Sequence, residues 1–250
     1  MQIISQDLFL KQEAYNASEI KHLYPFMKSS DEIDGYRCSF GNMCSGYPFN
    51  LLGTNISFYN SEAAYITGLF SNDTDEHRNI QQQLIVCQNG YEAKRNIRIP
   101  MTHLQRSDIY DFNITWMFYV VWSKCKTNSD FANLLLSLPD DAVIIENSYH
   151  QTSPSATIWG THNDILKNAL KEKQNQLLLS NQYKKEQIYH IISKLRCTDY
   201  LHCGFFTGCN VMGKILMICK RCLKYNVEAP VDYNLLNSKD IYINGQLLSF

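Results

Sequence analysis

The sequence predicts a single domain of the α+β class over residues 1–250, mainly helical and with a small sheet. Apolar residues recur at helical spacing through most of the chain after residue 60. The expected strands are short and lie between Gly, Pro and Asn residues. No internal repeat, low-complexity tract or Pro/Gly/Ser-rich linker divides the 250 residues, which are enough to bury one sizeable core.

The first strands are expected around the stretch "YRCSFGNMCSGYPFN", residues 36–50. Aromatic and polar side chains alternate over residues 36–40 and 47–59, around turns at Gly46 and Gly53. These aromatics suit an ordinary strand and turn, and they also suit the edge of a pocket for a flat polar ligand. A helix is expected from about residue 61, because Asn60 or Ser61 can cap its first turn.

The rest of the chain is expected to be mostly helical. Residues 74–88 suit one helix, and residues 105–138 suit a long amphipathic helix and a shorter one, with a break near residues 128–129. Residues 163–195 suit a solvated helical insertion, and residues 211–225 suit the last long helix. Two strand regions remain: the apolar run "DAVIIENS", ending at Glu146, and a terminal pair around the turn signal Asn244-Gly245.

Composition and charge exclude some classes of protein. The chain is 45% hydrophobic and 19% charged, and no apolar run approaches the roughly 20 residues that cross a bilayer. We therefore expect no membrane association. The net charge of −1 gives no overall attraction to nucleic acid, so any nucleotide would be recognised in a local pocket. The N-terminus lacks the pattern of a secretory signal, which favours a cytoplasmic protein.

The nine cysteines are expected to be free thiols, because nothing indicates export to an oxidising compartment. Their one local cluster contains Cys203, Cys209, Cys219 and Cys222. The last two lie in an expected helix and not on the short knuckles that zinc sites use. We expect neither a metal site nor a disulfide.

Two glutamates stand out as candidates for chemistry. Glu62 lies in the first turn of its helix, where a carboxylate either caps the helix or does chemistry. Glu146 ends an apolar strand, where a carboxylate must be exposed, paired or functional.

Further residues fit either packing or ligand binding. Lys94 lies in a small basic cluster that suits a solvated face as well as an anion site. Trp159 beside Gly160 suits the core as well as a stacking platform. Asn210, between two glycines at a helix start, lies where backbone N–H groups can bind phosphate, although no Walker or dinucleotide motif is present.

The order of these motifs is informative. Phe40-x-Asn42 is followed by "YNSEAAY", "EAK", a long helix with "LLLSL", then "VIIENS", the Trp-Gly step and "GCNVMGKILM". This series resembles the NADAR family, the YbiA-like NAD- and ADP-ribose-associated N-glycosidases. The resemblance runs from about residue 36 to residue 223, with residues 164–200 as a helical insertion.

The resemblance implies a mainly helical single domain whose pocket hydrolyses an N-glycosidic bond without a cofactor or metal. It implies two catalytic residues, Glu62 and Lys94. The implied substrate-binding residues are Phe40, Asn42, Glu146, Trp159, Gly160 and Asn210. The chain departs from the family where Ala63 and Ala156 replace the usual His and Asp, and where "QTSPSAT" lengthens the loop before Trp159.

A mechanism follows from these assignments. Glu62 would stabilise the ribosyl cation or direct water, and Lys94 would form a Schiff base with the opened ribose or hold a phosphate. Trp159 and Phe40 would stack on a base, Asn42 would bind a base edge, and the Asn210 turn would bind the diphosphate.

The implied substrate is ADP-ribosylated guanine, as a nucleotide or in nucleic acid, so that the enzyme would reverse the modification made by an ADP-ribosyltransferase toxin. Two alternatives stay open. One is an N-glycosidase acting on phosphorylated intermediates of riboflavin synthesis, and the other is a non-catalytic sensor of ADP-ribose or NAD.

Overall fold

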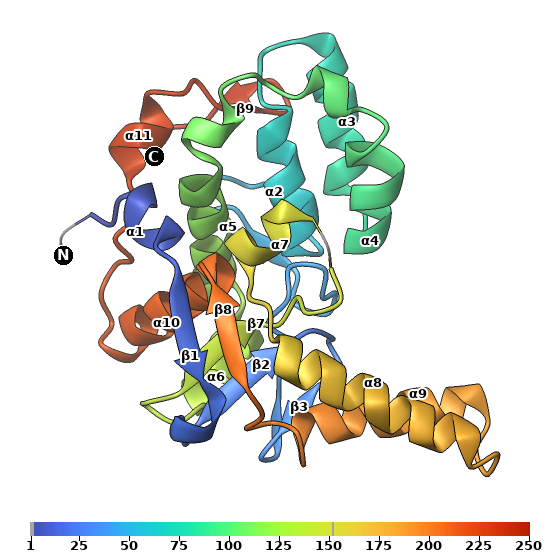
Figure 1. The fold of residues 1–250 in the computed structure, drawn as a ribbon. Coiled ribbons are helices and arrows are strands. Elements are labelled where there is room, and N and C mark those ends of the chain that lie inside the picture. Colours follow the sequence, from blue (N-terminus) through green and yellow to red (C-terminus); the bar gives the residue numbers. More distant parts are fainter. Residues whose placement is uncertain (1–2, 152) are drawn as a thin grey trace. The chain divides into compact units, whose positions relative to one another are not determined.

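The computed structural model describes residues 3–151 and 153–250, and it confirms an α+β fold in which helices dominate (Figure 1). The chain forms two compact units. Unit 1 comprises residues 1–8, 42–136 and 218–250, and unit 2 comprises residues 9–41 and 137–217. Each unit is assembled from separate stretches of the chain, and the single domain over residues 1–250 stays a prediction.

Unit 1 is mostly helical. Its elements are β5 (Phe49–Asn50), β6 (Ser57–Phe58), α2 (Ser61–Leu69), α3 (Asp75–Ile85), α4 (Gly90–Glu92), the π-helix η2 (Ala93–Arg98), the 3-10 turns η3 (Thr102–Leu104) and η4 (Ile109–Asp111), α5 (Asn113–Thr127), α11 (Tyr233–Asn237), β9 (Tyr242–Ile243) and β10 (Gln246–Leu247). Three helices contain points where the chain passes from one unit to the other: α1 (Gln6–Leu10), α6 (Ser129–Ser137) and α10 (Val211–Lys224).

Unit 2 contains most of the longer strands. Its elements are β1 (Glu13–Asn16), the 3-10 turn η1 (Ala17–Glu19), β2 (Leu23–Phe26), β3 (Glu32–Ile33), β4 (Tyr36–Arg37), β7 (Val143–Glu146), α7 (Pro154–Trp159), α8 (Asp164–Leu179), α9 (Lys185–Cys197) and β8 (Phe205–Gly208).

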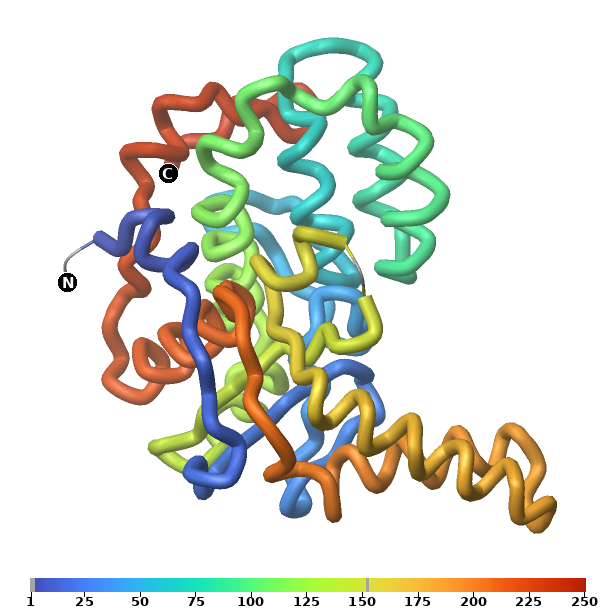
Figure 2. Tube along the Cα trace, in the orientation of Figure 1, coloured from blue at the N-terminus to red at the C-terminus, as the bar shows by residue number. Residues whose placement is uncertain are grey.

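Helix α2 is the centre of unit 1. All nine of its residues are buried, because α3, α5 and η2 pack around it (Figure 2). Contact with α5 is close at Gly68, where a Cβ atom would lie 2.1 Å from the indole nitrogen of Trp116. That indole N–H donates to the carbonyl oxygen of Tyr65 at 3.0 Å, which fixes the packing of the two helices.

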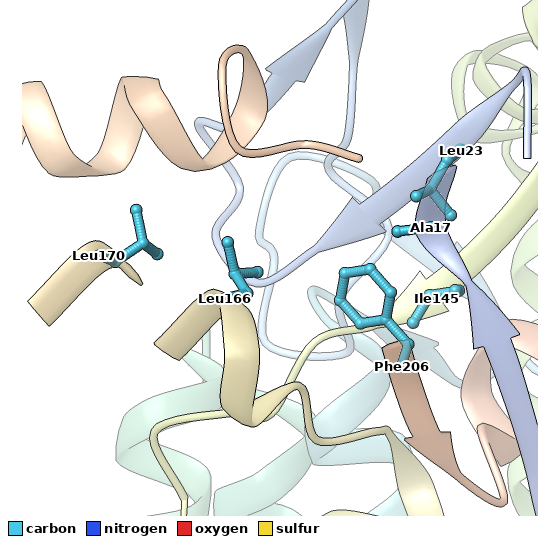
Figure 3. Packing of buried hydrophobic residues seen from close by; sticks show 6 residues of the cluster. All are labelled: Ala17, Leu23, Ile145, Leu166, Leu170 and Phe206. Atoms are coloured by element: carbon cyan, nitrogen blue, oxygen red, sulfur yellow. The ribbon is translucent and has the colours of Figure 1, made fainter. Parts of the chain in front are cut away.

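The sheet of unit 2 is built from short paired segments. Strand β2 pairs in parallel with β7, from Leu23 opposite Val143 to Phe26 opposite Glu146, and β1 pairs antiparallel with β8. Single bridges pair Asn147, just after β7, with Thr161 and pair His162 with Thr207 of β8. A core of six buried residues covers this sheet (Figure 3): Ala17, Leu23, Ile145, Leu166, Leu170 and Phe206.

Helices α8 and α9 form an antiparallel hairpin that extends away from the strands of unit 2 (Figure 1). Only one end of it packs against the core of the unit, through Leu166 and Leu170 of α8 and through Ile192 and Leu195 of α9. Most of the outer half is exposed, as expected for a solvated insertion. The hairpin turns at Asn181, whose φ of 53° lies in the left-handed region that Asn tolerates.

Most of the expected elements are confirmed. Helix α2 begins after the N-cap Asn60, the chain breaks between α5 and α6 at Asn128, and the terminal strands turn at Asn244 and Gly245, both with positive φ. The sequence analysis did not predict β1, β2, β8 or the π-helix. Strand β2, "LYPF", is buried throughout and contains Pro25, so it shows neither the alternation nor the composition of a typical strand.

Among the helices in residues 3–151 and 153–250, none combines the length and the apolar composition needed to cross a bilayer.

A buried lysine lies inside unit 1. The side chain of Lys124, on α5, is 1% exposed, and its Nζ atom has no hydrogen-bond partner within the described part of the chain. Its nearest charge-stabilising groups are the aromatic rings of Phe131 and Tyr47, whose centroids lie 4.0 Å and 5.1 Å from Nζ. Burial lowers the pKa of Lys124 to about 8, against smaller opposing effects of Cys44 and Cys125.

Replacing this lysine with methionine is expected to change how stability depends on pH. Because the folded-state pKa of Lys124 is about 8 and the unfolded-state value is 10.5, the unfolded chain binds more protons between these values. The wild type therefore gains about 3 kcal/mol relative to Lys124→Met as the pH rises through this window. Urea unfolding of both proteins from pH 7 to 10.5 measures the difference. The exposed Lys171→Met serves as control, and parallel curves for Lys124→Met and wild type would contradict the assignment.

Candidate functional site

The carboxyl group of Glu62 is the unusual feature of unit 1. Glu62 occupies the second position of α2, yet it is only 7% exposed. Within the described residues its carboxyl has neither a hydrogen bond nor an ion pair. Burial raises the pKa of Glu62, and the positive charges of Lys94 and Arg98 oppose the shift. A carboxylate in this state is a stronger base than a solvated one, and it attracts a cation or a donor.

Two asparagines flank Glu62. Asn60 caps α2, since its Oδ1 accepts from the N–H of Ala63 at 2.8 Å and its Nδ2 donates to the carbonyl of Cys87 at 3.0 Å. The carbonyl of Asn42 accepts from the N–H of Glu62 at 3.0 Å, so the segment at residue 42 lies against the helix start. The side-chain Oδ1 of Asn42 is buried and has no donor among the described residues. Asn42 thus holds an acceptor beside Glu62 that a ligand N–H or O–H can occupy.

The two cations that act on Glu62, Lys94 and Arg98, lie in an uncommon type of helix. Lys94 and Arg98 belong to the π-helix η2, which packs against α2. Such helices are rare and are enriched at functional sites, because the wider turn redirects side chains. Lys94 is half-buried, and the guanidinium of Arg98 lies 6.0 Å from the ring centre of Tyr65 on α2. The predicted residues Asn42, Glu62 and Lys94 are therefore brought together within unit 1.

The other predicted residues belong to unit 2, where Asn210 holds the end of β7. Asn210 is fully buried, with a φ of 50°. Its Oδ1 accepts from the N–H of Glu146 at 3.0 Å, and its Nδ2 donates to the carbonyl of Ile144 at 3.0 Å. The half-buried Glu146 is thereby fixed through its backbone.

Gly160 lies directly against Glu146. A Cβ atom at Gly160 would be 2.6 Å from the carbonyl oxygen of Glu146, so only glycine fits. The N–H of Thr161 then donates to the same carbonyl at 2.8 Å. Trp159 is the last residue of α7 and is half-buried. Glu146, Trp159, Gly160 and Asn210 are thus grouped within unit 2.

Two of the predicted binding residues are engaged within unit 2. Phe40 is fully buried and packs edge-on against Phe26, with ring centres 5.7 Å apart, so no face of its ring is open to a base. The side chain of Asn210 is occupied by the backbone of β7, and its N–H donates to the carbonyl of Gly160 at 3.2 Å. The structure gives both residues a packing role, and their binding roles stay predictions.

Two surface hollows of unit 1 lie elsewhere. One, of about 320 Å³, is lined by Asn72, Asp73, Arg106, Asp108, Ser238, Lys239, Asp240 and Tyr242. The other, of about 560 Å³, is lined by Pro48, Asn55, Ile56, Ser57, Phe58, Tyr59, Ile85, Val86 and Asn244. Neither includes a predicted site residue. In the first, Arg106 is held by Asp108 in a two-point ion pair, so its charge is already compensated.

All nine cysteines are free thiols in the structure, and seven of them are buried. Among the described residues, no group of three or more His, Cys, Asp or Glu side chains is arranged to hold a metal ion. That neither metal nor disulfide is needed stays a prediction.

Comparison of the sequence with models of known protein families and with curated proteins finds no match. The resemblance to the NADAR family therefore depends on the order of motifs and on the residues described above.

The sequence analysis missed two features of unit 1. Arg98 was not singled out as a site residue, although its spacing of four residues from Lys94 indicates a shared helix face. The burial of Lys124 was not predicted. The one indication in the sequence is that eight apolar or aromatic residues precede Lys124 within the same helix.

Glu62→Gln is expected to stabilise the protein at neutral pH. Because the pKa of Glu62 is raised in the folded state, the folded chain binds more protons than the unfolded chain above the unfolded-state pKa, and stability falls as the pH rises. Glutamine removes the buried charge, so the melting temperature should rise by roughly 2–4 °C for each kcal/mol gained. The gain should vanish near pH 4. Thermal unfolding from pH 4 to 8 measures this, with the exposed Glu92→Gln as control. Equal curves for Glu62→Gln and wild type would mean that the carboxyl is solvated.

Proposed function

We propose that this protein is an N-glycosidase that hydrolyses a ribosyl C–N bond, with ADP-ribosylated guanine as its substrate. The observation that carries the proposal is the buried carboxyl of Glu62, which has no partner of its own in the described chain and faces two cations. The resemblance to the NADAR family supports the same reaction on separate grounds, through the order of motifs.

The chemistry of C–N cleavage matches these groups. As the bond breaks, positive charge develops on the anomeric carbon and ring oxygen, and the base leaves with the bonding electrons. Water then adds to the anomeric carbon, and the proton that it loses is passed through Glu62 to the leaving nitrogen of the base. A desolvated Glu62 carboxylate stabilises the cation and accepts that proton, since burial makes it a stronger base. Lys94 and Arg98 supply positive charge for the diphosphate of ADP-ribose.

Asn42 adds a specific contact to this proposal. Its buried Oδ1 lacks a donor among the described residues, and both ribose hydroxyls and guanine N–H groups are donors. An acceptor in this state favours a ligand that supplies a donor at that point. Stacking by Trp159, which is half-buried at the end of α7 in unit 2, stays a separate prediction.

The enzyme class is favoured over the sensor for a physical reason. A sensor needs only groups that bind ADP-ribose, and binding alone gives no reason to bury a carboxylate. An enzyme has a use for such a group, because the transition state carries positive charge. The family positions occupied by Ala63 and Ala156 hold buried methyl groups here, so any role of the usual His and Asp is absent.

The direct test is incubation with an oligonucleotide that contains ADP-ribosylated guanine, with mass spectrometry for unmodified guanine. Release of guanine and ADP-ribose is expected. A second reaction with phosphorylated riboflavin intermediates tests the alternative substrate. Tight binding of ADP-ribose without turnover of either substrate would identify a sensor and would reject the proposal.

Glu62→Gln should lower turnover of the oligonucleotide by roughly 100-fold or more, because the amide keeps the shape and loses the charge that the transition state needs. Affinity for ADP-ribose should be largely kept. Single-turnover rates and ADP-ribose titration measure the two quantities separately. Glu92→Gln, an exposed change on the neighbouring helix α4, should keep the wild-type rate. A near-normal rate in Glu62→Gln would remove this residue from the mechanism.

Lys94→Arg separates the two roles proposed for the lysine. A guanidinium can hold a phosphate but cannot form an imine at working pH. Retained activity, within about 10-fold of wild type, is expected if Lys94 acts as a fixed positive charge. Complete loss of activity, together with a borohydride-trapped adduct on wild-type Lys94, would instead establish a Schiff base.

A further inference from the structure

Two buried hydrogen-bond donors of unit 2 have no partner among the described residues. They are Nη1 of Arg196, on α9, and Nδ2 of Asn147, just after β7. Both residues are 1% exposed. A buried donor without an acceptor is unfavourable, and a charged one more so. A ligand with negatively charged oxygen atoms could accept hydrogen bonds from both donors.

Arg196 is held in place by Asp31, which leaves one end of its guanidinium free. The carboxylate of Asp31 accepts from Nη2 of Arg196 and from the N–H groups of Met27 and Lys28, at 2.9 Å and 2.8 Å. Asp31 is itself 3% exposed. Its carboxylate is therefore occupied, and it fixes Arg196 beside the end of β2 with Nη1 unused.

Asn147 lies beside the same strand end. Strands β2 and β7 are parallel and end together at Phe26 and Glu146. The N–H of Asn147 donates to the carbonyl of Phe26 at 2.9 Å, which puts Asn147 next to the residues that bind Asp31. Its Oδ1 accepts from the N–H of Tyr149 at 3.3 Å, so the amide orientation leaves Nδ2 free. Ligand sites in parallel sheets form at this carboxyl end of the strands.

Cationic and aromatic side chains lie on or against the same elements as the two donors. Lys28 is half-buried, and its Nζ lies 3.9 Å from the ring centre of Tyr189 and donates to Ser193 Oγ at 3.3 Å. His150 is exposed, and burial of part of its ring, followed by the charges of Arg196 and Lys28, lowers its pKa. The charges of Arg196 and Lys28 thus both act on His150. Arg196 and Lys28 carry two positive charges against one negative charge of Asp31.

We propose that Arg196, Asn147 and Lys28 form a phosphate-binding site at the carboxyl end of the β2–β7 pair. A phosphate offers several acceptor oxygens and negative charge, which matches a free guanidinium edge, an amide NH₂ and an ammonium. The inserted hairpin then has a function, since α9 supplies Arg196. This inference goes beyond the proposed glycosidase activity and is tested by binding alone.

The experiment is isothermal titration of the full-length chain with inorganic phosphate, pyrophosphate and ADP-ribose. Saturable binding of at least one is expected. Arg196→Met should weaken it by about 10-fold to 100-fold, because a charged hydrogen bond is lost. Lys194→Met is the matched control, since it removes the same charge from an exposed position two residues away on α9. It should change affinity less than 2-fold.

Asn147→Asp keeps the acceptor for Tyr149 and removes the free donor, so it should abolish phosphate binding even if Arg196→Met does not fold. Tighter binding of ADP-ribose than of pyrophosphate would identify a nucleotide as the source of the phosphate, and equal binding of inorganic phosphate would identify a free anion; both support the site. The absence of saturable binding by wild type, or equal losses in Lys194→Met and Arg196→Met, would overturn it. Failure of the glycosidase assay would leave this result unaffected.

Discussion

The structure of unit 2 depends on one side chain, Asn210, which completes the free edge of β7. The groups that it binds, the carbonyl of Ile144 and the N–H of Glu146, point to the same side of the strand. Their partners on a neighbouring strand would be a peptide N–H and C=O, and the Asn210 amide supplies both. The Asn side chain therefore acts as one residue of an added strand. It joins the start of α10 to β7 without a further strand.

Several neighbouring features follow from this contact. The close approach leaves no room for a Cβ at Gly213, which would lie 2.2 Å from the carbonyl of Ile144. Beyond the amide, the edge of β7 continues through the bond from Thr161 to the carbonyl of Glu146. This places Gly160 against Glu146 and fixes the end of α7. The position of Trp159 thus depends on a hydrogen bond made by a residue about fifty positions later in the chain.

Local signals in the sequence were sufficient for elements that are stabilised by neighbours in the chain. Asn60 caps α2 and Asn244-Gly245 turns the terminal strands, and both act within a few residues. Strand β2 could not be predicted, because its partner β7 lies more than a hundred residues away and its own sequence contains Pro25. In the same way, the glutamate at the start of α2 was visible as a candidate, whereas its burial depends on the packing of α5 and η2. Arg196 lay within the helical insertion expected over residues 164–200, for which the sequence indicated no binding role.

The buried asparagines differ in whether the fold satisfies both ends of the side-chain amide. Asn60, Asn163 and Asn210 are buried, and both ends of each amide bond to backbone groups, so they are explained by the fold alone. Asn42 and Asn147 each keep one buried end without a partner in the described chain. The two free ends differ in kind. Asn42 presents an acceptor, which suits the hydroxyls or N–H groups of a nucleoside, and Asn147 presents a donor, which suits a phosphate oxygen. Because burial of either end has a cost that the described fold does not offset, we propose a ligand of the complementary kind at each.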